Sequence, residues 1–244
     1  MNLIIDIGNS LCKVAVMESG QIIEMIRVPA LTLSLLENFL RGYPAIRGAV
    51  LSTVRNDDSE MENFLKKKFE QFLKVTHQTP LPIRNGYSTP QTLGIDRLMS
   101  AVGAVAQFPG KELLIFDLGS AITIDHVSAE GEFLGGNISP GMNLRFKALH
   151  AFTEKLPMCY ADENFSLIGK TTEEAIKNGV ILGIINEIHG YIDLYLAKNE
   201  EIVVIFTGGD AKYFVFKVKN TIFVDCLLLL KGLNKVLEYN YDQN

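Results

Sequence analysis

Two aspartates stand in matching contexts far apart in the chain. Asp6 and Asp117 each close a short apolar run, and Gly8 and Gly119 follow them two positions later. A glycine there lets a ligand approach the backbone, and paired carboxylates hold hydrated metal ions against phosphate oxygens. Taken singly, Asp-x-Gly after a strand is also an ordinary hairpin turn. Its occurrence twice in one register favours a nucleotide site with a carboxylate on each of two facing walls.

A lysine accompanies only the first of these aspartates. Lys13 lies in the apolar stretch that follows Asp6, where its ammonium would stand beside a bound phosphate. The matching position of the second copy is Ile124, so the two halves have specialised, and the second keeps Asp117 and the hydroxyl of Ser120. The alternative is that Lys13 is an exposed strand lysine.

A second chemically capable cluster is Gly94-Ile95-Asp96-Arg97. A carboxylate at Asp96 could accept a proton from a hydroxyl, and Arg97 offers a planar fork for an acidic group. Asp96 could instead be only a favourable charge at a helix N-terminus. Base and clamp together favour a hydroxy acid as substrate.

The two aspartates belong to a longer repeat. Residues 3–16 align with residues 114–127 without a gap, and Gly20 and Gly131 continue the alignment at the same offset of 111 positions. Each copy reads as a strand, a turn, a second strand and a glycine turn into a third. The sequence therefore predicts a duplicated α/β fold.

The remaining elements follow from periodicity and from helix and turn signals. We expect two lobes, residues 1–110 and 111–244, with the last helix able to pack back on the first lobe. A proline-rich loop at 79–93 precedes the Gly94 cluster, and Thr171 to Glu174 form a capping box. The other expected elements are strands at 3–6, 13–17, 22–27, 49–53 and 202–206, and a glycine-rich turn at 135–141 that is followed by a helix ending at 149. Further helices are expected at 33–41, 59–72, 95–107, 171–196 and 227–237.

Composition sets the class of protein. The chain has 244 residues, 48% of them hydrophobic, and a net charge of −5, which argues against nonspecific binding of nucleic acid. Its three cysteines lack metal-ligand spacing and suggest reduced thiols. No leader-like segment and no apolar run long enough to cross a bilayer stand out, so we expect a cytoplasmic protein without membrane contact.

Together these motifs resemble one family. The set looks like type III pantothenate kinase, of the actin-like, hexokinase-like ATPase superfamily, and the resemblance runs in order from Asp6 to Gly209. Ser10 and Ser120 stand where that family more often has Thr, which keeps the hydroxyl. The motifs are Asp6-x-Gly-Asn-Ser10 with Lys13, Gly94-x-Asp-Arg97, Asp117-x-Gly-Ser-Ala121 with Thr123, Gly135-Gly-x-Ile-x-Pro-Gly141 and Thr207-Gly-Gly209.

The resemblance implies a fold and a reaction. The fold would be a duplicated actin-like (ribonuclease H-like) ATPase fold, with two lobes around a nucleotide cleft. The reaction would be ATP-dependent phosphorylation of pantothenate to 4'-phosphopantothenate, the first step of coenzyme A biosynthesis. Family members are homodimers whose long helices pack together.

The resemblance also implies roles for particular residues. Asp6 would organise Mg²⁺ through water, and Asp117 would hold a monovalent cation, K⁺ or NH₄⁺. Asp96 would be the base, Arg97 would engage the pantothenate carboxylate, and Thr172 would serve a site completed across the dimer interface. The implied ATP-binding residues are Asp6, Ile7, Gly8, Asn9, Ser10, Leu11, Cys12, Lys13, Ser120, Gly208 and Gly209. The implied substrate-binding residues are Tyr87, Gly94, Ile95, Asp96, Arg97 and Thr172.

Two rival readings stay open. Another small-molecule kinase or a phosphatase of the same fold would share the Asp6 and Asp117 turns but would not need Gly94-x-Asp-Arg97. A nonenzymatic accessory or regulatory protein of the family would be expected to lack Asp96, Lys13 or Asp117, and all three are present.

Overall fold

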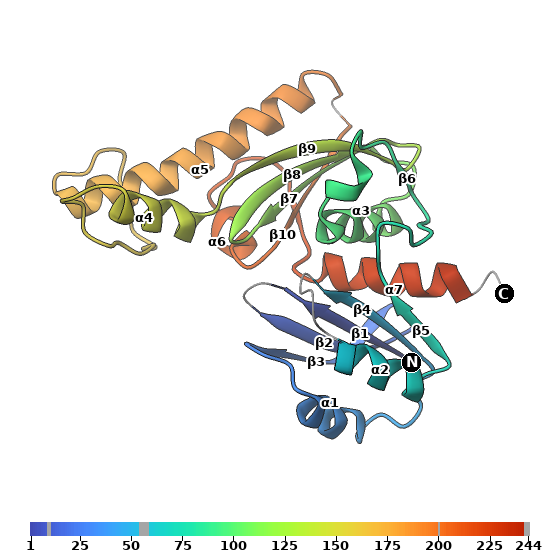
Figure 1. Ribbon diagram of the computed structural model, residues 1–244. Coiled ribbons are helices and arrows are strands. Elements are labelled where there is room, and N and C mark those ends of the chain that lie inside the picture. The colour runs from blue at the N-terminus through green and yellow to red at the C-terminus, as the bar shows by residue number, and fades with distance from the viewer. Residues whose placement is uncertain (9–10, 54–58, 200, 242–244) are drawn as a thin grey trace. The chain divides into compact units, whose positions relative to one another are not determined.

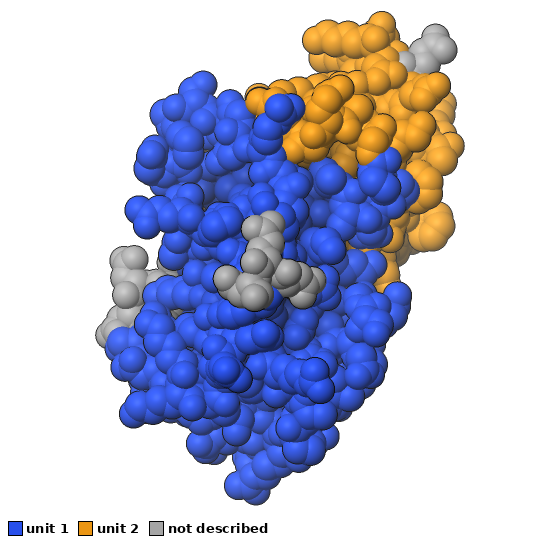
Figure 2. Space-filling model, turned by 90° about the vertical axis from the view of Figure 1, so that its right-hand side faces the viewer, with its two compact units in different colours: residues 1–109, 228–244 blue, residues 110–227 orange. Residues whose placement is uncertain are grey.

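The chain forms two compact units. A computed structural model describes residues 1–244 except 9–10, 54–58, 200 and 242–244. Unit 1 comprises residues 1–109 and 228–244, and unit 2 comprises residues 110–227 (Figure 2). The last helix, α7 (Leu228–Tyr241), therefore belongs to the same unit as the N-terminal strands.

Unit 1 is built on a mixed sheet with the strand order β3-β2-β1-β4-β5 (Figure 1). β1 pairs antiparallel with β2 and parallel with β4, and β4 pairs parallel with β5. The expected helix at 59–72 is too long, because α2 ends at Lys68 and β5 begins at Gln71. The bounds are β1 Asn2–Ile7, β2 Cys12–Glu18, β3 Gln21–Val28, β4 Gly48–Thr53, β5 Gln71–Lys74, α1 Leu33–Leu40 and α2 Ser59–Lys68.

The two faces of this sheet have different neighbours. Leu3, Ile5 and Ile7 pack in one core with the buried residues of α1 and α2. Successive strand residues point to opposite faces, so the even-numbered residues of β1 face the other way. There the Nδ2 of Asn2 donates to the Oδ1 of Asn234 on α7 at 2.8 Å. Asp6 consequently shares the α7 face of the sheet.

α3 (Ile95–Gln107) matches the expected helix at 95–107 and packs closely along α7. This packing buries the apolar face of α3. Glycines on both helices permit this. A Cβ on Gly103 would lie 2.3 Å from the carbonyl oxygen of Leu228, and one on Gly232 would lie 1.8 Å from that of Met99. Before α3 the proline-rich loop contains only β6 (Arg84–Asn85) and a 3-10 turn at Pro90–Thr92. The helix that carries the Gly94 cluster is thus firmly seated in unit 1.

In unit 2 the strands follow the order β11-β10-β7-β8-β9. The expected glycine-rich turn at 135–141 is wrong, because β9 continues to Pro140. Apolar side chains of β7, β8 and β10 share a core with α4, α5 and α6. The bounds are β7 Leu113–Leu118, β8 Ala121–Val127, β9 Glu132–Pro140, β10 Val203–Thr207, β11 Phe223–Val224, α4 Met142–Ala151, α5 Thr172–Leu196 and α6 Ala211–Val215.

The predicted capping box opens α5. The backbone N–H of Glu174 donates to the Oγ1 of Thr171 at 3.2 Å. The Glu174 carboxylate accepts the backbone N–H of Lys170 at 2.7 Å. In a standard capping box it would accept the N–H of the N-cap residue, Thr171.

Both copies of the repeat form the expected strand pair, but their connecting turns differ in length. Four residues, 8–11, separate the paired Ile7 and Cys12 of β1 and β2, whereas three residues, 119–121, separate the paired Leu118 and Ile122 of β7 and β8. The second copy therefore has one residue fewer in its turn, and its longer β8–β9 connection restores the offset. In consequence the residue opposite Asp117 is Thr123, and Ile124 is not the spatial counterpart of Lys13.

Candidate active site

The first candidate corner lies at the end of β1. Asp6 is paired with Lys13 across the β1–β2 ladder, and the Lys13 Nζ lies 3.5 Å from the Asp6 Oδ2. Burial raises the pKa of Asp6 above its ordinary value, the Lys13 ammonium opposes that rise, and the charge of Asp96 adds to it. A buried carboxylate with a raised pKa is a group that a cation would stabilise in its ionised form.

The described residues at the two ends of the turn after Asp6 could contact a ligand through backbone atoms. The N–H of Gly8 donates to the carbonyl oxygen of Leu11 at 3.2 Å, which closes the turn. Ile7 and Cys12 have their side chains in the α1/α2 core, so they could meet a ligand only through main-chain atoms. Asn9 and Ser10 lie outside the described residues.

The second candidate group lies in the same unit, at the start of α3. Gly94 is the N-cap residue, and the Asp96 Oδ1 accepts the backbone N–H of Arg97 at 2.9 Å. A Cβ on Gly94 would lie 2.4 Å from that same Oδ1. The missing side chain therefore leaves the space in which the exposed Asp96 carboxylate folds back over the helix N-terminus.

Arg97 and Tyr87 come together as the predicted substrate residues of the acceptor side. Arg97 is only 5% exposed, and its guanidinium carbon lies 5.7 Å from the centre of the Tyr87 ring. Stacking against an aromatic ring holds a guanidinium in one orientation. The Tyr87 ring thus helps to hold the largely buried Arg97 guanidinium in one orientation.

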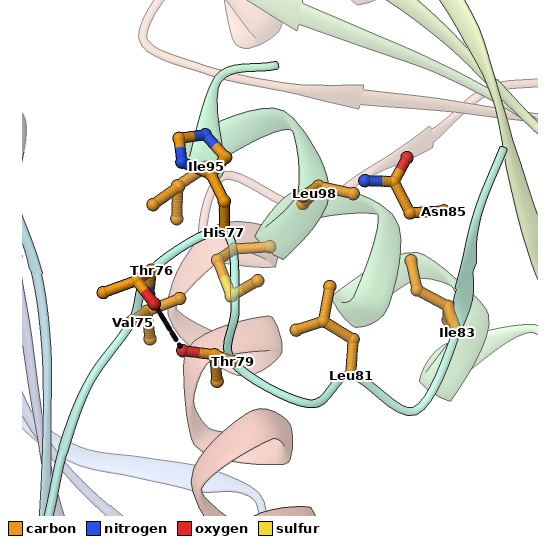
Figure 3. Close-up of a pocket in the computed structure, with 10 residues that line it drawn as sticks. Val75, Thr76, His77, Thr79, Leu81, Ile83, Asn85, Ile95 and Leu98 are labelled. Atoms are coloured by element: carbon orange, nitrogen blue, oxygen red, sulfur yellow. Dashed lines mark hydrogen bonds between the residues drawn. The ribbon is translucent and has the colours of Figure 1, made fainter. Parts of the chain in front are cut away.

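The residues just before the proline-rich loop contact this segment. The His77 Nε2 donates to the carbonyl oxygen of Leu93 at 2.9 Å, just before Gly94. Figure 3 shows the loop passing α3, with His77 beside Ile95. A cavity of about 170 Å³ lies between the loop and the helix, lined by Val75, Thr76, His77, Thr79, Leu81, Ile83, Asn85, Ile95, Leu98 and Met99. Ile95 thus contributes to the support of the segment.

The third candidate group surrounds Asp117 in unit 2. Gly208 has a φ of +89°, and a Cβ there would lie 2.4 Å from the Asp117 Oδ1 and 2.5 Å from the carbonyl oxygen of Leu118. The N–H of Asp210 also donates to that Leu118 oxygen, at 2.8 Å. The Gly208 turn is therefore held directly against the Asp117 carboxylate.

The Ser120 turn has its own glycine contact. The N–H of Gly141 donates to the carbonyl oxygen of Ser120 at 3.1 Å, and a Cβ on Gly141 would lie 2.0 Å from the oxygen of Gly119. Ser120 and Gly209 are exposed, so both could meet a ligand. Thr172 is also exposed, but it lies in the capping turn of α5 and outside the contacts that define this corner.

Three polar residues near Asp117 were absent from the predicted site. Thr123 and Asp125 share the strand face of Asp117, and burial raises the pKa of Asp210, which follows the Gly208 turn. The available signal was the alternation of polar and apolar residues over 122–125.

Two kinds of feature are absent from the described part of the chain. In the described ranges, which omit 9–10, 54–58, 200 and 242–244, no cluster of three or more His, Cys, Asp or Glu side chains could bind a metal ion. Over the same residues, no helix has the length and apolarity to traverse a bilayer.

The space at Gly94 leads to a prediction. In Gly94→Ala the new methyl group would displace the Asp96 carboxylate, because a flexible side chain moves more easily than backbone. Misplacement of a reacting group by about 1 Å can lower a rate about 10²-fold, so we expect turnover to fall by a large factor with little loss of stability. Steady-state kinetics and thermal unfolding measure both. Gly42→Ala, where the new Cβ has only an ordinary contact at 3.7 Å, should behave as wild type; equal kinetics of the two variants would contradict the prediction.

Asp6 leads to a prediction about pH. Because its pKa is raised in the folded chain, the unfolded chain releases this proton first, and the stability contributed by the group is lost as the pH rises from 3.8 through the folded pKa. We therefore expect Asp6→Asn to unfold at a higher temperature than wild type at pH 7, with the difference shrinking towards pH 4. Thermal unfolding of nucleotide-free protein in EDTA measures this. A lower unfolding temperature at pH 7 would show that the charged carboxylate stabilises the fold.

The sequence of this chain matches a known protein family. The model of a family described as "Type III pantothenate kinase" matches residues 2–194. A protein named type III pantothenate kinase from Phocaeicola vulgatus is 43% identical over 98% of this chain and 99% of its own length. One of the same name from Christiangramia forsetii is 42% identical over the full length of both.

Solved structures agree on the fold. A putative Baf family transcriptional activator from Campylobacter jejuni aligns with a TM-score of 0.62 at 24% identity, over 98% of this chain and 99% of its own. A putative N-acetylmannosamine kinase from Listeria monocytogenes aligns with a TM-score of 0.55 at 14% identity, over 100% and 99%. The fold is that of the actin-like ATPases, and by sequence over its whole length the chain belongs to the type III pantothenate kinase family.

Proposed function

We propose that this chain is an ATP-dependent kinase that transfers a phosphoryl group to the primary hydroxyl of pantothenate, the step that begins coenzyme A biosynthesis. The observation that carries the proposal is the position of Asp96 at the start of α3, where it accepts the backbone N–H of Arg97 and lies close enough to Asp6, in the same unit, for its charge to raise the pKa of Asp6. A base, an anion clamp and a buried phosphate-side carboxylate thereby occur together.

On the acceptor side the residues divide the work. Arg97, fixed by the ring of Tyr87, would bind the carboxylate of pantothenate. Asp96 would accept the proton of the hydroxyl that attacks the γ-phosphate. Gly94 supports the proposal because its missing side chain leaves room for the Asp96 carboxylate. Ile95 and Thr172 complete the proposed acceptor residues.

On the nucleotide side the two strand-end turns would bind ATP. Lys13 would neutralise charge on the phosphates, and the backbone from Asp6 to Lys13 would line them, together with Ser120, Gly208 and Gly209. The raised pKa of Asp6 fits a carboxylate that meets a cation when the site is loaded. As the family resemblance implies, Asp6 would hold Mg²⁺ through water, and Asp117 would hold a monovalent cation, K⁺ or NH₄⁺. The bound cations supply charge neutralisation on the phosphates.

We also propose that the chain works as a homodimer in the cytoplasm and that the two units are the two lobes of the fold. Support for the dimer comes from large apolar side chains that unit 2 exposes on α4, on α5 and between them. A second copy would cover them. They are Leu144, Phe152, Leu167, Ile168 and Leu194, of which Phe152 is 88% exposed. Sedimentation of the purified protein tests the dimer.

The test of function is a coupled assay of ADP release. Purified protein with MgATP should release ADP when pantothenate is added, more rapidly with K⁺ than without it. Glucose, acetate and pantetheine serve as alternative acceptors. Release with acetate and none with pantothenate would reject the substrate, and no release with any acceptor would favour an accessory role.

A further inference from the structure

Three neighbouring strands of unit 2 carry a polar row on the face turned away from the α5 core. Thr207 is paired with Asp117, and Asp117 is paired with Thr123. Residues directly opposite one another in an antiparallel pair share a face, with their Cβ atoms about 4.5–5.5 Å apart. The Thr123 hydroxyl is therefore an immediate neighbour of the Asp117 carboxylate.

A buried carboxylate lies next to this row. Asp125 follows Thr123 by two positions on β8, so it shares the same face, and it is 1% exposed. The Oγ1 of Thr123 donates to the Oδ2 of Asp125 at 3.0 Å. No role proposed so far involves Asp125.

The neighbouring strand leaves space for that carboxylate. Gly136 is the residue paired with Asp125 on β9, and a Cβ on Gly136 would lie 2.6 Å from the Asp125 Oδ1 and 2.1 Å from the carbonyl oxygen of Ile124. The glycine therefore permits the strand to approach with the buried carboxylate in place. The Thr123–Asp125 bond is thus built into the sheet.

That bond fixes the direction of the hydroxyl. A threonine hydroxyl has one proton and two lone pairs. When the Thr123 hydroxyl donates its hydrogen bond to Asp125, the lone pairs of the Thr123 oxygen can still bind another partner. Carboxylate and other oxygen atoms are the ligands that hard cations prefer. Thr123 and Asp117 together therefore present oxygen atoms suited to a cation.

We propose that Thr123 is a second oxygen ligand of the monovalent cation assigned to Asp117, and that Asp125 is a positioning residue that orients the Thr123 hydroxyl. This inference rests on the proposed function, which places the cation at Asp117. It goes further by naming the two side chains of β8 that would complete and orient the site.

The test uses thermal unfolding of the full-length protein in KCl and in choline chloride at equal ionic strength. A cation that binds only the folded chain raises the unfolding temperature of wild type. Thr123→Val should require about 10-fold more K⁺ for the same shift, as expected when a metal site loses a ligand or its support. Asp125→Leu, which cannot accept the Thr123 proton, should weaken the response in the same direction, whereas Thr123→Ser, which keeps the hydroxyl, should respond to K⁺ as wild type does. The K⁺ concentration for half-maximal ADP release should rise in parallel.

A matched control removes a threonine hydroxyl elsewhere in unit 2. Thr153 donates to the carbonyl oxygen of Leu149 at 2.7 Å, at the end of α4, and Thr153→Val should keep the wild-type response to K⁺. A wild-type K⁺ response in Thr123→Val would overturn the proposal. So would a wild-type protein that does not respond to K⁺. ADP release with pantothenate in that wild-type protein would show separately whether the proposed function survives.

Discussion

Asp96→Asn is expected to lower turnover with pantothenate by about 10²-fold or more, because an amide cannot accept the hydroxyl proton. The exchange preserves the local structure. The side-chain oxygen of Asn can still accept the N–H of Arg97, the contact that Asp96 makes at 2.9 Å, and the space left by Gly94 accommodates either group. The loss should therefore appear in kcat and not in folding.

The nucleotide side should change little in this variant. Removing the charge of Asp96 takes away one influence that raises the pKa of Asp6, so MgATP binding measured by calorimetry should be preserved. Glu37→Gln, which removes a carboxylate from the exposed face of α1, is the charge-matched control and should turn over as wild type. If Asp96→Asn kept wild-type turnover, Asp96 would not be the base. If it lost both turnover and MgATP binding, the unit 1 site would have been disturbed as a whole.

The sequence predicted correctly those features that depend on residues close together in the chain. The helix at Ile95–Gln107 has the predicted bounds, because a proline-rich loop precedes it and Pro109-Gly110 follows it. The placement of Lys13 next to Asp6 also followed from local pattern, since two strands joined by a short turn must pair. Neighbours along the chain decide such features.

Long-range pairing accounts for the errors. Phe69 and Phe72 continue the apolar spacing of α2 and pack with the same core, so periodicity alone extends the helix. In the structure residues 71–74 instead pair with β4, a contact that no local pattern encodes. At 135–141 the glycines suggested a turn, but Gly136 is a strand residue that allows β8 and β9 to approach.

The repeat shows a subtler limit. A constant offset concealed two length changes that cancel, and only the strand register reveals that Thr123 faces Asp117 as Lys13 faces Asp6. The polar partner of the second aspartate was therefore missed although it belongs to the motif. The ammonium of Lys13 in the first copy corresponds to the hydroxyl of Thr123 in the second. This difference is consistent with a bound cation that takes the place of an ammonium next to Asp117.

Gly208→Ala is expected to destabilise unit 2 and to displace the Asp117 carboxylate. Alanine is strained at a φ of +89°, and its Cβ would lie 2.5 Å from the backbone oxygen of Leu118 and 2.4 Å from the Asp117 Oδ1. Backbone would have to move, so we expect a loss of about 2 kcal/mol or more in the free energy of unfolding. The displaced Asp117 carboxylate should also lower activity and the response to K⁺.

The same substitution at the adjacent Gly209 is the control for backbone strain at Gly208. A Cβ on Gly209 would have no neighbouring atom within 4 Å, and the residue has no left-handed φ, so Gly209→Ala should leave the free energy of unfolding near the wild-type value. Denaturant unfolding of the two variants compares them directly. Equal stability of the two would mean that the Gly208 turn can relax away from β7. In that case the close approach of this turn to Asp117 would not be a requirement of the fold, and a loss of activity in Gly208→Ala would have to arise from contact with the nucleotide.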